Sequence, residues 1–209
     1  MKKNSRVRTK KLVIGLTGTF GSGKSTVGRM LGKASVSKVI DCDEWVREIF
    51  STENPIQKKI KRLFDIQGAT DRKKIASIVF SDQNMRRRLE ALIHPYVFRR
   101  MKEEIKAGEK GTIVFEIPLL FETGAERFCD ATIAVYANLK SIMRRLRKKG
   151  FSVQEIKARQ QAQFSQQEKK RKADFIINNS WEKEKLEKRV KRVWTKLISR
   201  DAFKSKRGV

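Results

Sequence analysis

A glycine-rich octapeptide near the start of the chain constrains the fold more than any other feature. Its residues, Gly18-Thr19-Phe20-Gly21-Ser22-Gly23-Lys24-Ser25, fit the spacing G-x-x-x-x-G-K-[ST]. The apolar run at 12–17 before it is typical of a buried strand, and a helix is expected over about 25–33. A strand, a glycine turn and a helix in this order predict the first unit of a parallel α/β sheet.

The same octapeptide, called the phosphate loop from here on, predicts a site for a nucleoside triphosphate. Glycines let the backbone curve around an anion with its N–H groups pointing inward, and the next helix adds its positive end. Lys24 supplies a cation for the β- and γ-phosphates, and the Ser25 hydroxyl can ligate Mg²⁺. We therefore expect ATP and Mg²⁺ as cofactors. The expected contacts come from Gly18, Gly21, Ser22, Gly23, Lys24, Ser25 and Thr26.

Apolar segments alternate with helical patterns along the rest of the chain. Four of these segments are expected to be strands, at 38–41, 112–116, 131–136 and 175–177. The alternation predicts an α/β fold, a parallel five-stranded sheet flanked by helices on both faces. Ligands of such sheets bind at the carboxyl ends of the strands, so the loops that follow the strands are the candidate site.

The segment 71–107 is helical in pattern and dense in charge. Ser81 or Asp82 is expected to cap a helix that ends near Ile93. Pro95 lacks a backbone donor and restricts the residue before it, so a new helix is expected to begin there. The only histidine, His94, lies at this junction, where packing or capping is favoured over acid–base catalysis.

Three carboxylates follow expected strands. If the chain is still extended at Asp41 and Asp43, both side chains point to one side. Either one can take the proton of an acceptor hydroxyl, hold Mg²⁺ through water, or simply cap the next helix. Glu116 ends an apolar strand, as in the Walker-B arrangement that assists Mg²⁺, and a solvent-exposed acid at a strand end is the alternative.

The charge balance is strongly basic, with 50 Lys and Arg against 23 Asp and Glu and a formal net charge of +27. Such a field attracts polyanions of several kinds, but most of it is expected to be solvated surface. The densest cationic stretch runs from Arg144 to Lys172, and one or two of its residues are expected to contact phosphate. Nucleic acid is a less favoured partner, because no zinc module or aromatic-interleaved signature accompanies the charge.

Cysteine usage and hydropathy favour a reducing cytosol and no membrane partner. Cys42 and Cys129 are the only cysteines and have no metal-binding spacing. No apolar run approaches the length of a membrane span. Residues 1–11 are expected to form a flexible basic tail, and 201–209 a second one.

Short motifs spread over about 12–199 resemble the dephospho-coenzyme A kinase family. After the phosphate loop come Val39-Ile40-Asp41-Cys42-Asp43, Leu92-Ile93-His94-Pro95 and Pro118-Leu119-Leu120-Phe121-Glu122, and then the spacing from Arg159 to Asn179. The resemblance implies transfer of the γ-phosphoryl group of ATP to the ribose 3′-hydroxyl of dephospho-coenzyme A. It also implies a P-loop kinase fold like that of the nucleoside monophosphate kinases.

The resemblance further implies a kinase domain over 12–200, with a helical acceptor-binding region near 50–107 and a lid near 144–170. It makes Asp43 the preferred base, with Lys24 as its catalytic partner. The implied acceptor contacts are Asp43, Arg47, His94, Pro118 and Arg159. The implied ATP contacts outside the phosphate loop are Arg144 and Lys148 in the lid and Asn179 at the adenine end.

The chain departs from the family pattern at several points. They are Thr19 in the phosphate loop, Cys42, a shortened stretch at 64–72, Lys148 at a usual lid arginine, and Asn178 at a frequent aspartate. Lysine in place of arginine loses a bidentate grip on phosphate. A nucleoside or nucleoside monophosphate kinase, and a nucleic-acid-binding NTPase, are the alternative functions.

Overall fold

The computed structural model describes residues 11–34, 37–68, 70–107 and 111–199. The chain forms two compact units, one up to Ile40 and again from Ile105 onward, the other from Asp41 to Glu104. The tails expected at 1–11 and 201–209 lie outside the described residues, apart from Lys11. In the described parts of the chain, no helix combines the length and the hydropathy that crossing a membrane requires.

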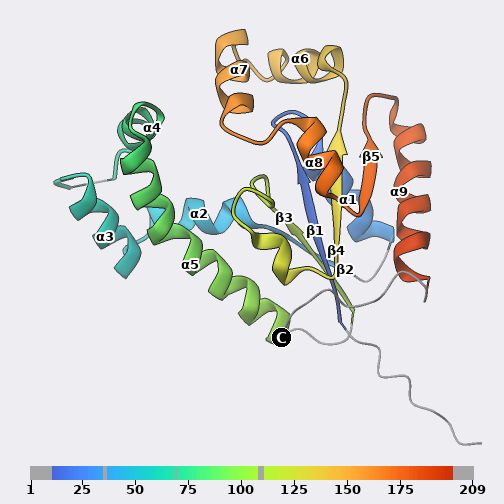
Figure 1. Ribbon diagram of the computed structural model, residues 1–209, viewed down its shortest axis with the longest axis horizontal. Helices are drawn as coiled ribbons and strands as arrows, with labels where there is room; N and C mark the ends of the chain where they lie inside the picture. Colours follow the sequence, from blue (N-terminus) through green and yellow to red (C-terminus); the bar gives the residue numbers. More distant parts are fainter. Residues whose placement is uncertain (1–10, 35–36, 69, 108–110, 200–209) are drawn as a thin grey trace, which may run out of the picture. The chain divides into compact units, whose positions relative to one another are not determined.

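The first unit is built on a five-stranded sheet with the order β2-β3-β1-β4-β5 (Figure 1). The strands are β1 (Leu12–Gly18), β2 (Ser37–Asp41), β3 (Thr112–Glu116), β4 (Ala131–Tyr136) and β5 (Phe175–Asn178). β1 pairs in parallel with β3 and with β4, and β4 pairs in parallel with β5. All five lie within one or two residues of the segments expected from the sequence. The expected fold class is therefore confirmed.

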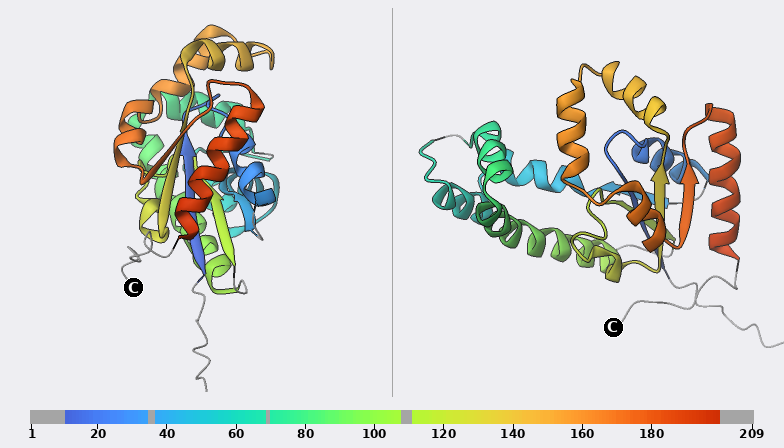
Figure 2. Two further views of the ribbon diagram at one scale, coloured as in Figure 1. Left: turned by 90° about the vertical axis from the view of Figure 1, so that its right-hand side faces the viewer. Right: turned by 45° about the horizontal axis from the view of Figure 1, so that its top comes forward.

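The two faces of the sheet follow from the alternation of side chains along β1. Ile14 and Leu16 are fully buried in a cluster with residues of α1 (Lys24–Ala34) and α9 (Lys183–Ile198). Gly15 points to the other face, where an added Cβ would lie 2.9 Å from the Cys129 Sγ. Figure 2 shows α9 lying along the sheet beside β5.

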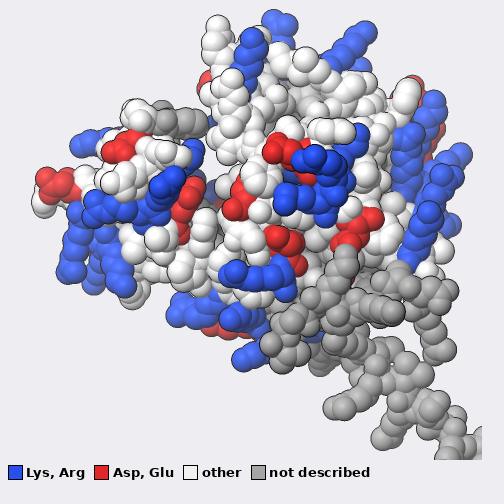
Figure 3. Space-filling model, viewed as in Figure 1, with Lys and Arg blue, Asp and Glu red and all other residues white. Residues whose placement is uncertain are grey.

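The exposed side of α9 carries a dense group of basic side chains. Its cations are Lys183, Lys185, Lys188, Arg189, Lys191, Arg192 and Lys196. Most of them are exposed, and they form a blue strip in Figure 3. The apolar stripe of the same helix, with Leu186 and Val190, is buried against the sheet. Here the charge is a solvated surface, as expected for most of the chain.

Three helices lie between β4 and β5. α6 (Leu139–Arg147) and α7 (Val153–Gln161) begin at the caps Asn138 and Ser152 and share a small apolar cluster. α8 (Gln166–Lys172) was not expected as a helix. Its capping box, the reciprocal hydrogen bonds of Ser165 and Glu168, has the S-x-x-E spacing that would have predicted it.

The second unit consists of helices with a core of their own. They are α2 (Cys42–Ser51), α3 (Pro55–Leu63), α4 (Arg72–Ser81) and α5 (Gln83–Ala107). Its buried cluster contains Ile49, Ile60, Phe64, Ile75 and Leu89. The Asn54 side chain caps α3, with Pro55 at the first helical position, where a missing N–H costs nothing.

One expectation in this unit is wrong: the helix does not break at Pro95. α5 begins after its cap Asp82, which accepts from the Asn84 amide at 2.8 Å, and continues without interruption to Ala107. Proline removes one backbone hydrogen bond from the helix. Buried side chains on both sides of it, Leu89 before and Met101 after, hold the helix in one piece, so tertiary packing outweighs the local penalty.

Candidate active site

The phosphate loop keeps backbone donors that have no acceptor. The Ser22 amide donates to the Thr19 carbonyl at 3.0 Å, which closes the turn. The amides of Phe20, Gly21 and Gly23 donate no hydrogen bond within the described residues. Because buried or crowded amides nearly always find a partner, unpaired donors ahead of a helix N-terminus indicate a site for an anion.

Two hydroxyls of the loop are also unsatisfied. Thr19 Oγ1 and Ser22 Oγ are buried and lack a hydrogen-bond partner among the described residues. Leaving such a group buried and unpaired costs about 1–3 kcal/mol. Phosphate oxygens would accept from both the hydroxyls and the loop amides.

The loop conformation requires glycine at two positions. Gly21 and Gly23 have φ of 83° and 90°, in the left-handed region that other residues rarely adopt. A Cβ on Gly21 would lie 2.6 Å from Leu146 Cδ1, and one on Gly23 would clash with the amide of Asn179. The two glycines therefore allow the backbone conformation of the turn, and they also leave room for the side chains of Leu146 and Asn179.

Lys24 and Glu116 form a nearly buried ion pair beside the loop. Lys24 Nζ lies 3.0 Å from Glu116 Oε2, and the two side chains are 12% and 4% exposed. Glu116 is thus a buried partner of the loop lysine, and the solvent-exposed alternative is excluded. Gly28 makes this possible, because a Cβ on that residue would clash with the Glu116 carboxylate. Sequence reasoning missed Gly28, a glycine inside a helix that follows the loop.

The residues present fit a magnesium ion. Ser25 is exposed at the start of α1, and its hydroxyl makes no hydrogen bond within the described residues. Glu116 adds a carboxylate near the same end of the sheet. Mg²⁺ binds such oxygen ligands and keeps several waters. Among the described residues, no group of three or more His, Cys, Asp or Glu side chains could hold a metal ion.

Asn179 and Arg145 stabilise the phosphate loop through hydrogen bonds to backbone carbonyls. The Asn179 side-chain amide donates to the Ser22 carbonyl at 2.8 Å, and Arg145 donates to the Asn179 carbonyl at 2.6 Å. Burial, and then the neighbouring charge of Arg144, lower the pKa of Arg145. Its positive charge is partly desolvated and rests on neutral carbonyls, which leaves it uncompensated beside an anion site.

Arg145 was not among the predicted site residues, although Arg144 and Lys148 were. Arg144 on α6 and Lys148, the C-cap residue that follows the helix, are both exposed. Arg145 lies next to the buried Leu146 of the helix face that meets the loop. The spacing of the apolar residues on α6 would have singled it out.

The carbonyl of Pro118 is fixed by two donors. Thr17 Oγ1 donates to it at 3.0 Å and Lys169 Nζ at 2.7 Å. Lys169 is 1% exposed and also pairs with Glu122 at 2.7 Å. Burial lowers the pKa of Lys169, and Glu122 opposes that shift. The pair ties α8 to the segment after β3.

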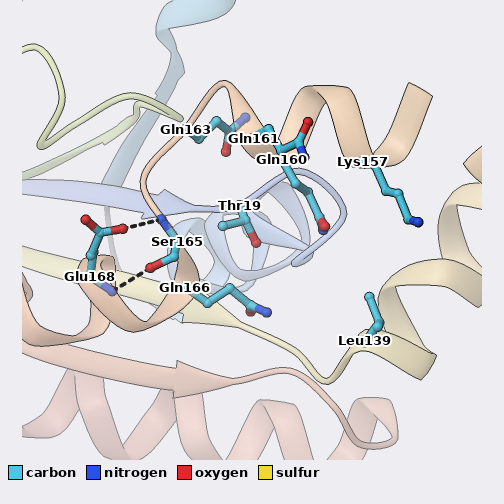
Figure 4. Close-up of a pocket in the computed structure, with 9 residues that line it drawn as sticks. All are labelled: Thr19, Leu139, Lys157, Gln160, Gln161, Gln163, Ser165, Gln166 and Glu168. Atoms are coloured by element: carbon cyan, nitrogen blue, oxygen red, sulfur yellow. Dashed lines mark hydrogen bonds between the residues drawn. The ribbon is translucent and has the colours of Figure 1, made fainter. Parts of the chain in front are cut away.

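A pocket of about 640 Å³ opens between the phosphate loop and the segment from α6 to α8 (Figure 4). Its lining is Thr19, Leu139, Lys157, Gln160, Gln161, Gln163, Ser165, Gln166 and Glu168. The Gln163 Oε1 is buried without a partner in the described residues, as is the hydroxyl of Thr19. A cavity of this size with polar groups unsatisfied is suited to part of a nucleotide-sized ligand.

In the second unit, Asp41 and Asp43 do not share one face of a strand. β2 ends at Asp41 and α2 begins at Cys42, so the extended geometry assumed for the pair is absent. Asp41 caps α2 by accepting from the Asp43 amide at 3.0 Å, and pairs with Arg47 at 3.3 Å. The Asp43 side chain is exposed in the first helical turn. The capping role therefore belongs to Asp41.

His94 lies inside α5, one turn before Phe98, with 5.9 Å between the ring centroids. Burial lowers the pKa of His94, and the charge of Glu90 opposes the shift. These surroundings are those of a packed side chain.

Arg159 lies on α7 in the first unit. Its guanidinium stacks over the rings of Phe20 and Phe151, with its Cζ 4.9 and 5.1 Å from the two ring centroids.

A parallel sheet, a glycine loop with unpaired donors, a helix N-terminus and a lysine paired with a strand-end carboxylate define a P-loop nucleotide-binding fold. The fold is shared with a shikimate kinase from Bacteroides thetaiotaomicron, at a TM-score of 0.52 and 20% identity over 89% of this chain and 98% of that one.

Comparison of sequences narrows this class. A profile of the dephospho-CoA kinase family matches residues 12–185, so the chain belongs to that family. The dephospho-CoA kinase of Thermus thermophilus is 37% identical over 190 residues, which cover 89% of this chain and 92% of that protein. A crystal structure from Thermus thermophilus matches with a TM-score of 0.79 and 36% identity, over 90% of this chain and 99% of that one.

Proposed function

We propose that this kinase transfers the γ-phosphoryl group of ATP to the 3′-hydroxyl of dephospho-coenzyme A and so forms coenzyme A. The observation that carries the proposal is the phosphate loop with its unpaired amides and its Lys24–Glu116 pair, in a chain of the dephospho-CoA kinase family. The loop is the reason for proposing ATP as the phosphoryl donor, and the family membership is the reason for proposing dephospho-coenzyme A as the acceptor.

ATP is held by the loop amides and by Lys24. The ion pair with Glu116 keeps the lysine head in place before the nucleotide arrives, so little rotamer entropy is lost on binding. Arg145 contributes a second cation from α6. Ser25, together with the phosphates, would hold Mg²⁺, which would neutralise the charge that develops on the transferring group. Asn179 supports the loop, and its contact with adenine stays a prediction.

The acceptor is held by the helical unit and activated by Asp43. Residues 50–107 are proposed as the acceptor-binding region, since α2 to α5 form a compact unit with its own core. Asp43 lies exposed in the first turn of α2, two residues after the strand end at Asp41, and it is proposed as the base. Arg47, His94, Pro118 and Arg159 remain proposed acceptor contacts, and the segment 144–170 the proposed lid.

Buried thiols at Cys42 and Cys129 support a reducing cytosol as the place of the reaction. Nucleic acid is not part of the proposal.

A panel of acceptors with labelled ATP tests the function. The purified protein is expected to label dephospho-coenzyme A and not uridine, nucleoside monophosphates or RNA. The Lys24→Ala protein, purified in parallel, controls for contaminating kinases. Labelling of a nucleoside or monophosphate, with none of dephospho-coenzyme A, would replace this proposal by the nucleoside kinase.

A further inference from the structure

The side chain of Phe20, a residue of the phosphate loop, packs against the helices α6 and α7. The apolar cluster of those helices is formed by Ala137, Ile142, Leu146 and Ile156, and the ring of Phe20 packs against it. The ring meets Phe151 edge to face, with 5.1 Å between the centroids. The core of the two helices is thus completed by a side chain from the loop.

Neighbouring backbone contacts fix the same arrangement. The Gln160 side-chain amide donates to the Phe20 carbonyl at 3.4 Å. At Gly21 the loop lies so close to Leu146 that an added Cβ would be 2.6 Å from its Cδ1. Arg145 reaches the Ser22 carbonyl at 3.4 Å. Three successive loop residues therefore contact α6 and α7, and the helices are seated on the loop.

The two rings carry a cation. The Arg159 Cζ lies 4.9 Å from the centroid of Phe20 and 5.1 Å from that of Phe151. The guanidinium is exposed and donates no hydrogen bond within the described residues. Glu155 lies one turn earlier on α7, and its carboxylate accepts a hydrogen bond from the Ser152 amide at 2.8 Å. A guanidinium stacked on an aromatic face keeps its edge donors available for phosphate oxygens.

We propose that Phe20 is a positioning residue that holds Arg159 beside the phosphate loop, where the guanidinium binds the phosphate groups of the acceptor. This inference rests on the proposed function and adds that Phe20 fixes the position of the Arg159 guanidinium. A free arginine side chain samples many rotamers, and fixing it on binding costs side-chain entropy. The ring removes much of that cost before the substrate binds.

A double-mutant cycle between the ring and the cation tests the proposal. Phe20→Leu keeps apolar bulk and removes the aromatic face, whereas Phe20→Tyr keeps the face. A cation–aromatic contact of this kind predicts that Phe20→Leu lowers kcat/KM for dephospho-coenzyme A about 3- to 10-fold, mainly through KM. Phe20→Tyr should restore it. In the Arg159→Ala background the same Phe20→Leu change should have no further effect, because the two residues act as one.

Phe128→Leu is the matched control. Phe128 and Arg127 lie in the short helix η1 (Ala125–Phe128), outside the proposed lid. The substitution removes the aromatic ring under Arg127, whose Cζ lies 5.0 Å from the ring centroid. It should leave kcat/KM unchanged in both backgrounds. Additive losses from Phe20→Leu and Arg159→Ala, or an equal loss from Phe128→Leu, would overturn the positioning role.

Amide hydrogen exchange adds a measurement that needs no substrate. Phe20→Ala should speed exchange in α7 relative to wild type, while Phe128→Ala should not. Equal exchange in α7 for Phe20→Ala and wild type would show that the ring does not seat the helix, and the inference would fall. A wild-type protein that binds ATP but leaves dephospho-coenzyme A unphosphorylated would instead overturn the proposed function. The exchange result would still decide the part played by Phe20.

Discussion

The phosphate loop and the helical unit place their candidate residues in opposite ways. Around the loop, Lys24 and Glu116 are nearly buried, and backbone carbonyls and amides do much of the holding. In the helical unit, Asp43 and Arg47 are exposed on the first turns of one helix. In a site made of backbone groups and buried pairs, a substitution changes both activity and the free energy of unfolding. In a site made of exposed side chains, a substitution can change activity and leave the free energy of unfolding nearly unaltered.

Lys24→Ala should give the largest effect on catalysis. It removes a cation aimed at the transferring phosphates, and comparable losses of one charge-stabilising donor reduce kcat about 10²–10³-fold. It also leaves Glu116 buried without its partner, so the free energy of unfolding should fall as well. Initial rates and urea denaturation measure the two effects. Lys33→Ala, at the exposed end of the same helix, should change neither, and wild-type turnover in Lys24→Ala would contradict the site.

Lys169→Met should give the largest effect on stability alone. Breaking a buried pair by removing one partner costs about 3–5 kcal/mol, because Glu122 stays buried and uncompensated. The double variant Lys169→Met/Glu122→Leu should recover a large part of that loss. Urea unfolding of the two proteins checks this, with Lys172→Met on the exposed end of α8 as the control. Equal stability of the single and double variants would remove the buried pair from the explanation.

Asp43→Asn tests the exposed site. As the proposed base, it should lose about 10²-fold in turnover, while ATP affinity and the free energy of unfolding stay close to wild type. Asp41→Ala is the informative contrast, because it removes a helix cap and should cost about 1 kcal/mol of stability. Rates, calorimetric ATP binding and urea denaturation separate these outcomes. Unchanged turnover in Asp43→Asn would remove this carboxylate from the mechanism.

The sequence predicted the loop well because glycine spacing is a statement about backbone conformation. Gly21 and Gly23 have the positive φ that such a turn requires, and the sheet follows the apolar segments closely. The family resemblance, carried by short motifs in order, is confirmed by the family profile over 12–185. The roles of the individual site residues stay predictions.

Tertiary packing accounts for what the sequence did not predict. Lys169 belongs to the run Lys169-Lys170-Arg171-Lys172, whose members look equally solvated until α8 packs on the sheet and buries one of them. Arg145 is one of four cations of α6, and the sequence alone did not separate it from the others for the same reason. Pro95 was overestimated as a helix breaker, because burial on both sides of it outweighs one missing hydrogen bond.

His94→Gln should give the smallest effect on stability, and that effect should depend on pH. Burial lowers the pKa of its imidazole in the folded chain, and Glu90 opposes the shift more weakly. The unfolded chain, with a histidine pKa of about 6.5, therefore binds the proton more readily than the folded one. The contribution of His94 to the free energy of unfolding is fully present above that pH, and is lost as pH falls through the lowered folded-state pKa.

The chain has one histidine, so His94→Gln removes the whole imidazole titration. Between about pH 7.5 and 5.5, urea denaturation should show the wild type losing more stability than His94→Gln, because only the wild type has a buried group to protonate. Turnover at pH 7.5 should change only if His94 also contacts the acceptor, which a rise in KM at constant kcat would reveal. Parallel pH profiles of stability for the two proteins would mean that the imidazole is not desolvated, and the helical unit would then be more open around α5 than its buried cluster implies.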